Sequence, residues 1–186
     1  PKFTRGAIKI FSSKKNLRII ELDKNRIFTN SNKLAVKSVF NGFLFQQKDE
    51  IINRNFEVVT DRKPNENQMK ALLLGWEIVR FVKSNAIVIS NSDSTIGIGS
   101  GQPSRLDSCE IAINKMKKFY KEKKNDEIVA ASDAFFPFVD GIEKLVQSGV
   151  SAVIQPSGSV KDKEIIKFAN RTNTVLVFSK TRHFKH

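Results

Sequence analysis

The feature that most limits the fold of this chain is a regular alternation of short apolar segments and helix-period segments between residues 86 and 178. A strand that is buried on both faces of a sheet appears in the sequence as such a short apolar run. They are predicted at AIVIS (86–90), TIGIG (95–99), EIVAAS (127–132), SAVIQ (151–155) and TVLVF (174–178). Helices are predicted over residues 104–124, 139–148 and 160–171. Single helices between strands indicate a parallel sheet with right-handed crossovers, to which the hairpin at residues 86–99 adds one antiparallel pair. The predicted fold is α/β, a three-layer αβα arrangement with a mixed, mostly parallel sheet.

The first 85 residues follow a different rhythm. LRIIEL (17–22) and FEVVT (56–60) predict strands, and residues 34–47 predict a longer β segment. The Asn41-Gly42 pair inside that segment fits either a hairpin turn or a bulge. Apolar residues at helical spacing then predict a helix over residues 65–83. The segment DRKPNEN before it is the best linker candidate.

Composition removes several classes of protein. Cys109 is the only cysteine and His183 and His186 are the only histidines, so a disulfide framework and a multi-cysteine zinc site are excluded and no zinc is expected. No apolar run reaches the roughly 20 residues that a membrane helix needs. The first residues, PKFTRGAIKIF, lack the pattern of a signal peptide. We therefore expect a cytoplasmic protein without a membrane partner.

The charge is strongly basic. Lys and Arg number 32 against 19 Asp and Glu, which gives a net charge of +13. The densest run comprises Lys115, Lys117, Lys118, Lys121, Lys123 and Lys124. A solvated helix end explains such a run, because cations are favoured near a helix C-terminus. A nucleic-acid-binding surface would also need exposed aromatic side chains on the same face as the basic residues. A basic surface also attracts small anionic ligands.

In a sheet of this kind, ligands bind beyond the C-terminal ends of the strands. That rule selects the loops Gly99–Arg105, Ser132–Asp140, Gln155–Asp162 and Ser179–His186. In the first loop, the glycines allow close approach of a ligand, and the helix N-terminus offers N–H groups to an anion. Arg105 there opposes the helix dipole, so it is either an anion ligand or a surface residue beside a tight turn.

The other loops also leave two interpretations open. Phe135, Phe136 and Phe138 crowd around a proline, and they are either core residues, as we expect for at least one, or a stacking surface for a flat heterocycle. Asp140 is also placed to cap the next helix, and residues 157–159 either cap a helix or hold an anion. The tail TRHFKH either frays or carries Arg182 to the ligand edge. No set of nucleophile, base and orienting residue is visible, and we expect Cys109 to be buried and inert.

Several sequence blocks, in order along the chain, resemble one family. They are KKNLR (14–18), VVTDRKP (58–64), VKSNAIVI (82–89), IGIGSGQPSR (96–105), ASDAFFPF (131–138), IQPSGSVKD (154–162) and RHFKH (182–186). Together they are similar to the C-terminal part of the aminoimidazole carboxamide ribotide (AICAR) transformylase domain in the bifunctional purine-biosynthesis enzymes. The set of ordered blocks is specific, whereas any one block alone is weak.

The resemblance implies a fold and an activity. The transformylase domain consists of two cytidine-deaminase-like subdomains without the deaminase zinc; residues 1–60 would end the first and residues 61–186 would form the second. The family enzyme transfers a formyl group from the co-substrate 10-formyltetrahydrofolate to the 5-amino group of AICAR, and a separate domain, the IMP cyclohydrolase, closes the product to inosine monophosphate. Family members form homodimers whose active sites combine both subunits.

The resemblance also implies ligand residues. AICAR would contact Asn85, Arg105, Phe135, Arg182 and His186. Folate would contact Pro137, Phe138 and Asp140. Asp133 would lie near a structural potassium ion.

One expected feature is not in its place. The family's catalytic Lys-His pair lies upstream of KKNLR, and the residues before KKNLR contain no such pair; the only Lys-His dipeptide is Lys185-His186. The cyclohydrolase domain is not in this sequence either. We therefore expect a fragment that carries part of a ligand site and is inactive alone.

Two other hypotheses compete with the transformylase fragment. A basic nucleotide- or RNA-binding module that reuses the fold would bind RNA with a steep salt dependence. A zinc deaminase would contain stoichiometric zinc, which the single cysteine opposes. We expect AICAR and folate as partners, with no nucleic acid.

Overall fold

The computed structural model describes residues 2–21, 34–49, 55–121 and 127–185. The chain divides into two compact units, Pro1–Lys48 and Asp49–His186.

The first unit contains a helix and a hairpin. Helix α1 (Arg5–Phe11) begins after Thr4, whose side chain accepts a hydrogen bond from the backbone N–H of Ala7. Strands β1 (Leu34–Val39) and β2 (Gly42–Gln47) pair antiparallel, with Val39 opposite Gly42. The interruption at Asn41-Gly42 is therefore a hairpin turn and not a bulge.

The strand predicted at residues 17–22 is wrong for the residues described. Residues 17–21 form no strand, and residue 22 lies outside the described part of the chain. The apolar side chains of Leu17, Ile19 and Ile20 are exposed. A short apolar segment alone does not make a strand, because a strand also needs a neighbour to pair with.

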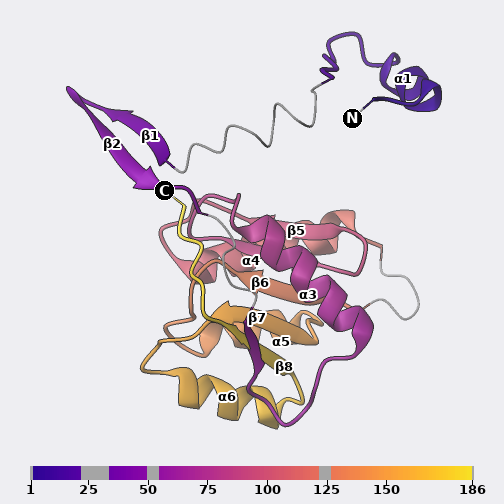
Figure 1. The fold of residues 1–186 in the computed structure, drawn as a ribbon. Helices are drawn as coiled ribbons and strands as arrows, with labels where there is room; N and C mark the ends of the chain where they lie inside the picture. Colours follow the sequence, from indigo (N-terminus) through magenta and orange to yellow (C-terminus); the bar gives the residue numbers. More distant parts are fainter. Residues whose placement is uncertain (1, 22–33, 50–54, 122–126, 186) are drawn as a thin grey trace. The chain divides into compact units, whose positions relative to one another are not determined.

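The second unit is built on a six-stranded mixed sheet (Figure 1). Its spatial order is β3 (Phe56–Val58), β8 (Val175–Ser179), β7 (Ala152–Pro156), β6 (Val129–Ser132), β4 (Ile87–Ser90) and β5 (Thr95–Gly99). The pairs β6–β7 and β7–β8 are parallel, whereas β3–β8, β4–β5 and β4–β6 are antiparallel. The sheet is mixed as predicted, but parallel pairs do not dominate it. The reason is that β4 lies between β5 and β6, so the hairpin contributes two antiparallel pairs, and β3 adds a third at the opposite edge.

Helices cover both faces of this sheet (Figure 1). Helix α3 (Glu66–Val79) lies on one face, and α4 (Arg105–Phe119), α5 (Asp140–Gln147) and α6 (Asp162–Arg171) lie on the other. Successive strand residues point to opposite faces. Thus Val88 and Ile154 pack in the cluster with α3, while Ile87 and Val153 pack in the cluster with the other three helices. The three layers are confirmed, and so are the predicted helices of this unit, with ends shifted by a few residues. Residues 122–124, the end of the helix predicted over 104–124, lie outside the described residues.

Two glycines of β5 bring α4 close to the sheet. A Cβ atom on Gly97 would collide with the carbonyl oxygen of Ala112, and one on Gly99 with that of Ser108. Their small size therefore serves the packing of a helix on a strand, not the approach of a ligand as the sequence suggested.

Four strands, β5 to β8, point in the same direction, so their C-terminal ends meet at one edge of the sheet. The antiparallel strand β4 begins at that edge, which adds Ser84 and Asn85 to it. No helix in the described residues is long and apolar enough to cross a membrane.

Candidate functional site

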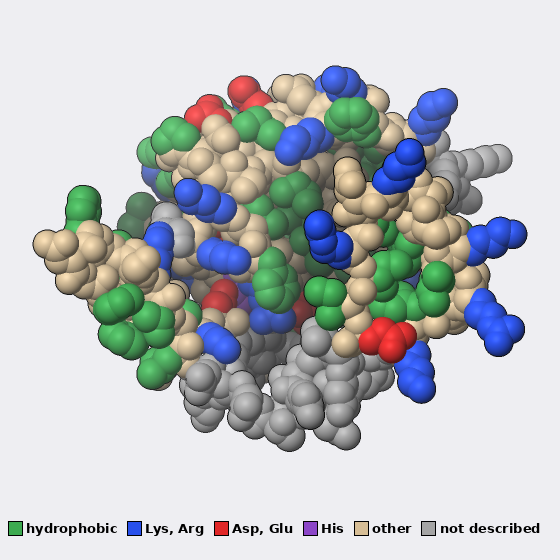
Figure 2. Space-filling model, turned by 90° about the horizontal axis from the view of Figure 1, so that it is seen from above, with side chains coloured by type: hydrophobic (Ala, Val, Ile, Leu, Met, Phe, Trp, Pro, Cys, Tyr) green, Lys and Arg blue, Asp and Glu red, His purple; other side chains and the backbone are tan. Residues whose placement is uncertain are grey.

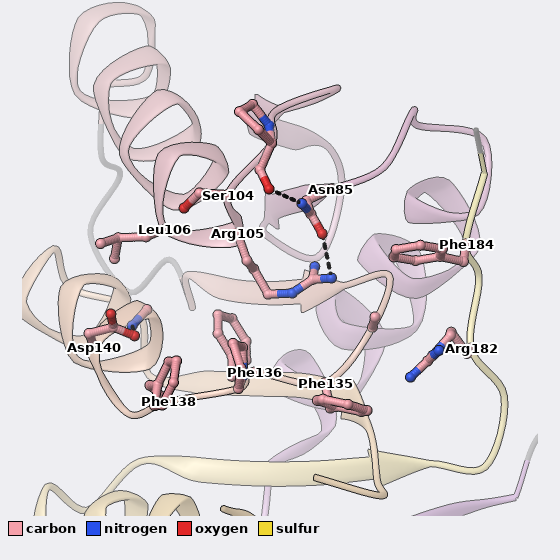
Figure 3. A pocket seen from close by; sticks show the side chains of 14 residues that line it. Asn85, Ser104, Arg105, Leu106, Phe135, Phe136, Phe138, Asp140, Arg182 and Phe184 are labelled. Atoms are coloured by element: carbon pink, nitrogen blue, oxygen red, sulfur yellow. Dashed lines mark hydrogen bonds between the residues drawn. The ribbon is translucent and has the colours of Figure 1, made fainter.

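A cavity of about 490 Å³ opens at this edge (Figure 3). Three of the four predicted loops contribute to its wall, together with Asn85 at the start of β4. It is lined by Asn85, Pro103, Ser104, Arg105, Leu106, Ala134, Phe135, Phe136, Pro137, Phe138, Asp140, Gly141, Arg182 and Phe184. The loop Gln155–Asp162 does not line it. Seven of the predicted ligand residues therefore share one cavity.

Arg105, the first residue of α4, is buried and occupied by protein partners. Its Nη1 lies 2.5 Å from Oδ1 of Asp133 and 3.0 Å from Oγ of Ser132. Its Nη2 donates to Oδ1 of Asn85 at 2.9 Å, as one dashed line of Figure 3 shows. Arg105 therefore fixes the carboxamide of Asn85, whose Nδ2 donates to the carbonyl of Gln102.

Asp133 is the centre of a buried network behind the cavity. Its Oδ1 accepts from Arg105, and its Oδ2 accepts from the hydroxyl of Ser84. Its backbone carbonyl accepts from the N–H of His183 at 2.9 Å. Both carboxylate oxygens thus already face donors of this chain, and one of these is a cation. This donor set does not fit a potassium ion bound by the Asp133 carboxylate, so we derive no step through that ion.

Arg182 contrasts with Arg105. It is exposed, and its guanidinium carbon lies 5.0 Å from the centroid of the Phe135 ring and 5.7 Å from that of Phe184. Within the described residues its guanidinium makes no ion pair. Figure 3 shows it directed into the cavity beside Phe135 and Phe184. It is a cation held by two rings and open to an anion.

The opposite end of the cavity carries Phe138 and Asp140 (Figure 3). The Phe138 side chain is 60% exposed, so it is not a core residue. Asp140 lies in the first turn of α5, and its Oδ1 accepts from the N–H of Gly141 at 2.7 Å. Its role as a side-chain N-cap is not observed, because Val139 is the N-cap residue of this helix.

The remaining predictions for loop residues have different outcomes. Phe136 is the phenylalanine expected in the core, with 1% exposure, and its N–H donates to Oε1 of buried Gln155 at 3.0 Å. Ser159 caps no helix; its Oγ accepts from the N–H of Lys161, the N-cap residue of α6. His186 lies outside the described residues.

Sequence reasoning missed Phe184 and Ser84. Phe184 stands two residues after Arg182, and the period of an extended chain would have placed both on one side. Ser84 carried no such signal, because its role depends on how the tail returns: its Oγ accepts from the N–H of Lys185 at 2.9 Å.

Comparison with known proteins adds the family. The model of the AICARFT/IMPCHase bienzyme matches residues 1–115. The chain belongs to the AICARFT/IMPCHase bienzyme family. Among similar proteins are those named bifunctional purine biosynthesis protein PurH from Staphylococcus saprophyticus (44% identical, all of this chain, 37% of the relative), Ligilactobacillus salivarius (42%, all of this chain, 36%) and Aquifex aeolicus (42%, all of this chain, 35%). The chain thus spans little more than a third of the length of these relatives.

The family model matches only part of the residues that line the cavity. Asn85 and Arg105 fall within the residues that the family model matches, whereas the phenylalanine loop and Arg182 lie beyond residue 115. The similarity to the PurH proteins extends over the whole chain and includes both. Both halves of the cavity are therefore inside the region shared with members of the bienzyme family.

Two other features of this bienzyme-family chain bear on chemistry. Burial raises the pKa of the Cys109 thiol to about 12, so the thiol is inert as predicted. No group of three His, Cys, Asp or Glu side chains that could hold a metal ion occurs in the described part of the chain.

The basic charge of the chain is dispersed. Figure 2 shows Lys and Arg side chains spread over the visible face, with few acidic ones between them. Lys123 and Lys124, part of the basic run, lie outside the described residues.

Proposed function

We propose that this chain forms the C-terminal part of an AICAR transformylase active site, where a formyl group passes from 10-formyltetrahydrofolate to the 5-amino group of AICAR. The observation that carries the proposal is the single cavity in which an exposed arginine, a fixed carboxamide and exposed aromatic rings converge. The family membership of the chain makes a purine-pathway ligand the natural occupant.

The ribotide would bind at the Arg182 end. The guanidinium of Arg182 would pair with the phosphate, because a charge-assisted, bidentate bond suits that anion. Phe135 would lie against the flat imidazole ring. Arg105 would act on the ligand chiefly by orienting Asn85, since three of its five N–H donors already have protein acceptors.

The folate would bind at the other end of the cavity. The exposed ring of Phe138, beside Pro137, offers a stacking surface for a pterin. The carboxylate of Asp140 offers acceptor oxygens to the N–H groups of that heterocycle.

Formyl transfer itself would need groups supplied by other parts of a longer protein. The resemblance assigns proton transfer to a Lys-His pair upstream of KKNLR, and it implies active sites that combine residues of two subunits. We therefore expect this chain alone to bind without transferring formyl groups. The division into two cytidine-deaminase-like subdomains, at about residue 60, belongs to the same proposal.

The test compares two matched variants of the tail by isothermal titration calorimetry. Arg182→Ala removes the cavity cation, and Lys180→Ala removes an exposed charge from the same segment that does not line the cavity. Arg182→Ala should weaken AICAR binding by about 1.5–3 kcal/mol, roughly 10- to 150-fold. The same Arg182→Ala change should weaken binding of the unphosphorylated riboside much less. Lys180→Ala should bind AICAR with the affinity of the original chain.

Three results would argue against the proposal. Equal losses in the two variants would indicate general electrostatic attraction instead of a phosphate site. Equal losses for ribotide and riboside would remove Arg182 from the phosphate. Salt-sensitive binding of a short RNA without any AICAR binding would favour the basic RNA-binding module.

A further inference from the structure

The tail alternates between two environments. Arg182 and Phe184 line the cavity, whereas His183 between them is completely buried on the other side. This is the period of an extended chain. A segment that carries a binding cation near the end of a unit would fray without an anchor, so the contacts of His183 decide where Arg182 lies.

The side chain of His183 has a charged partner from a distant segment. Its Nδ1 lies 2.8 and 2.9 Å from the two carboxylate oxygens of Asp49. The backbone carbonyl of Asp49 in turn accepts from Nη1 of Arg80 at 3.2 Å. An ionised carboxylate only accepts hydrogen bonds, so Nδ1 must carry the proton and the ring orientation is fixed.

The ring of His183 also packs on Trp76, with centroids 4.4 Å apart and an interplanar angle of 53°. Trp76 is a core residue of α3 with 1% exposure. Other polar ties also hold the tail: the N–H of His183 donates to the carbonyl of Asp133, the N–H of Lys185 to Oγ of Ser84, and Nζ of Lys185 to the carbonyl of Phe81. None of these bonds depends on the side chain at position 183. The contacts with Asp49 and Trp76, in contrast, are made by the imidazole ring itself.

We propose that His183 and Asp49 form a positioning pair that holds Arg182 and Phe184 in the cavity. His183 touches no ligand in this arrangement and acts through its neighbours. The nature of the anion rests on the proposed function; the anchoring of the tail does not.

The first experiment follows the tail without any ligand. Trp76 is the only tryptophan of the chain, so its fluorescence reports directly on His183. Asp49→Asn and His183→Leu should change the emission of Trp76 and speed the release of C-terminal residues by a carboxypeptidase by about tenfold or more. His183→Asn, which keeps an amide donor near the position of Nδ1, should recover part of the protection. Asp93→Asn, which alters an exposed aspartate paired with Lys70, is the matched control and should change neither signal.

The second experiment is a double-mutant cycle on AICAR affinity, measured by calorimetry. His183→Leu and Asp49→Asn should each weaken AICAR binding about tenfold in the original chain, and hardly at all when Arg182→Ala is already present. Equal losses in both backgrounds would overturn positioning through Arg182. Unfolding midpoints identify a variant that fails to fold, and the exposed Asp49→Asn change then carries the test.

The two proposals fail in different ways. If the original chain binds no AICAR but both variants release the tail, the proposed function is wrong and the anchoring stands. If the tail stays protected and the Trp76 emission is unchanged in Asp49→Asn and His183→Leu, the positioning pair is wrong whatever the ligand.

Discussion

Arg105 and Arg182 lie in the same cavity and yet face different physical situations. Arg105 is 8% exposed and has Asp133, Ser132 and Asn85 as partners. Arg182 is exposed and lies against two rings. A buried guanidinium without a counter-ion would be costly, so the Arg105–Asp133 pair is needed by the fold as well as by the site.

Breaking the Arg105–Asp133 pair should therefore cost stability. Asp133→Ala leaves the Arg105 charge buried without its counter-ion, and we expect the free energy of unfolding to fall by about 3–5 kcal/mol. Urea denaturation followed by circular dichroism measures the change. Asp93→Ala, which breaks an exposed pair with Lys70, should cost at most about 1 kcal/mol. Similar losses in the two variants would mean that the buried pair contributes no more than a surface one.

The sequence identified Arg105 as a candidate site residue but did not reveal its protein partners. The position of Arg105 in the first turn of α4, against the helix dipole, left open either an anion contact or a surface residue beside a tight turn. The actual partner, Asp133, is 28 residues away, and no local pattern links them. Phe135 and Arg182 lie in loops that follow strands β6 and β8, and the predicted direction of these strands placed both loops at the ligand edge.

At the scale of the elements, the contact of α4 with β5 depends on glycine. A side chain on Gly99 would meet the backbone of Ser108, which cannot yield as a flexible side chain can. Gly99→Ala should therefore destabilise the second unit by about 1–3 kcal/mol through overpacking. Because α4 begins with Arg105, AICAR affinity should fall as well.

Gly6 supplies the control for this prediction. It lies in helix α1, and a Cβ there would meet nothing within 4 Å. Gly6→Ala should leave stability unchanged or raise it by up to about 1 kcal/mol. Thermal unfolding of both variants measures the difference, and a Gly99→Ala midpoint equal to that of Gly6→Ala would contradict the close contact.

The elements themselves could largely be predicted, but their neighbours could not. Apolar period distinguishes strand from helix, so β4 to β8 and α3 to α6 appeared at the expected places. It does not say which strand lies beside which, and the insertion of β4 between β5 and β6 was missed for this reason. Helix α1 was missed because its seven residues are too few for a helical period to be recognised.

At the scale of the whole molecule, the two units differ in how they treat apolar side chains. The second unit contains both core clusters. The described residues of the first unit include no buried side chain. Its exposed large apolar residues are Ile8, Ile10, Phe11, Leu17, Ile19, Ile20, Leu34, Val36, Phe40, Phe43, Leu44 and Phe45. Exposed apolar surface of this extent is typical of a face that another protein surface covers.

Removing residues 1–48 should therefore reduce self-association while leaving the free energy of unfolding almost unchanged. We expect residues 49–186 to unfold with a free energy within about 1 kcal/mol of that of the full chain, since no core residue is lost. The full chain should self-associate with rising concentration, and the shortened one much less. Light scattering and urea denaturation measure the two effects. Equal association of both proteins, or a large loss of stability on shortening, would contradict this division.

The network around Asp133 has a consequence for how the molecule acquires its binding surface. It ties residues that are 28, 49 and 101 positions apart in the chain: Arg105 to Asp133, Ser84 to Asp133, and Lys185 to Ser84. Contacts of such separation form late, because the entropy of closing long loops must be met before they contribute. A folding chain can therefore pair its central strands before the tail that carries Arg182 is in place. In this protein, competence to bind should be reached with the last step of folding, and a refolding experiment that monitors only secondary structure would report completion too early.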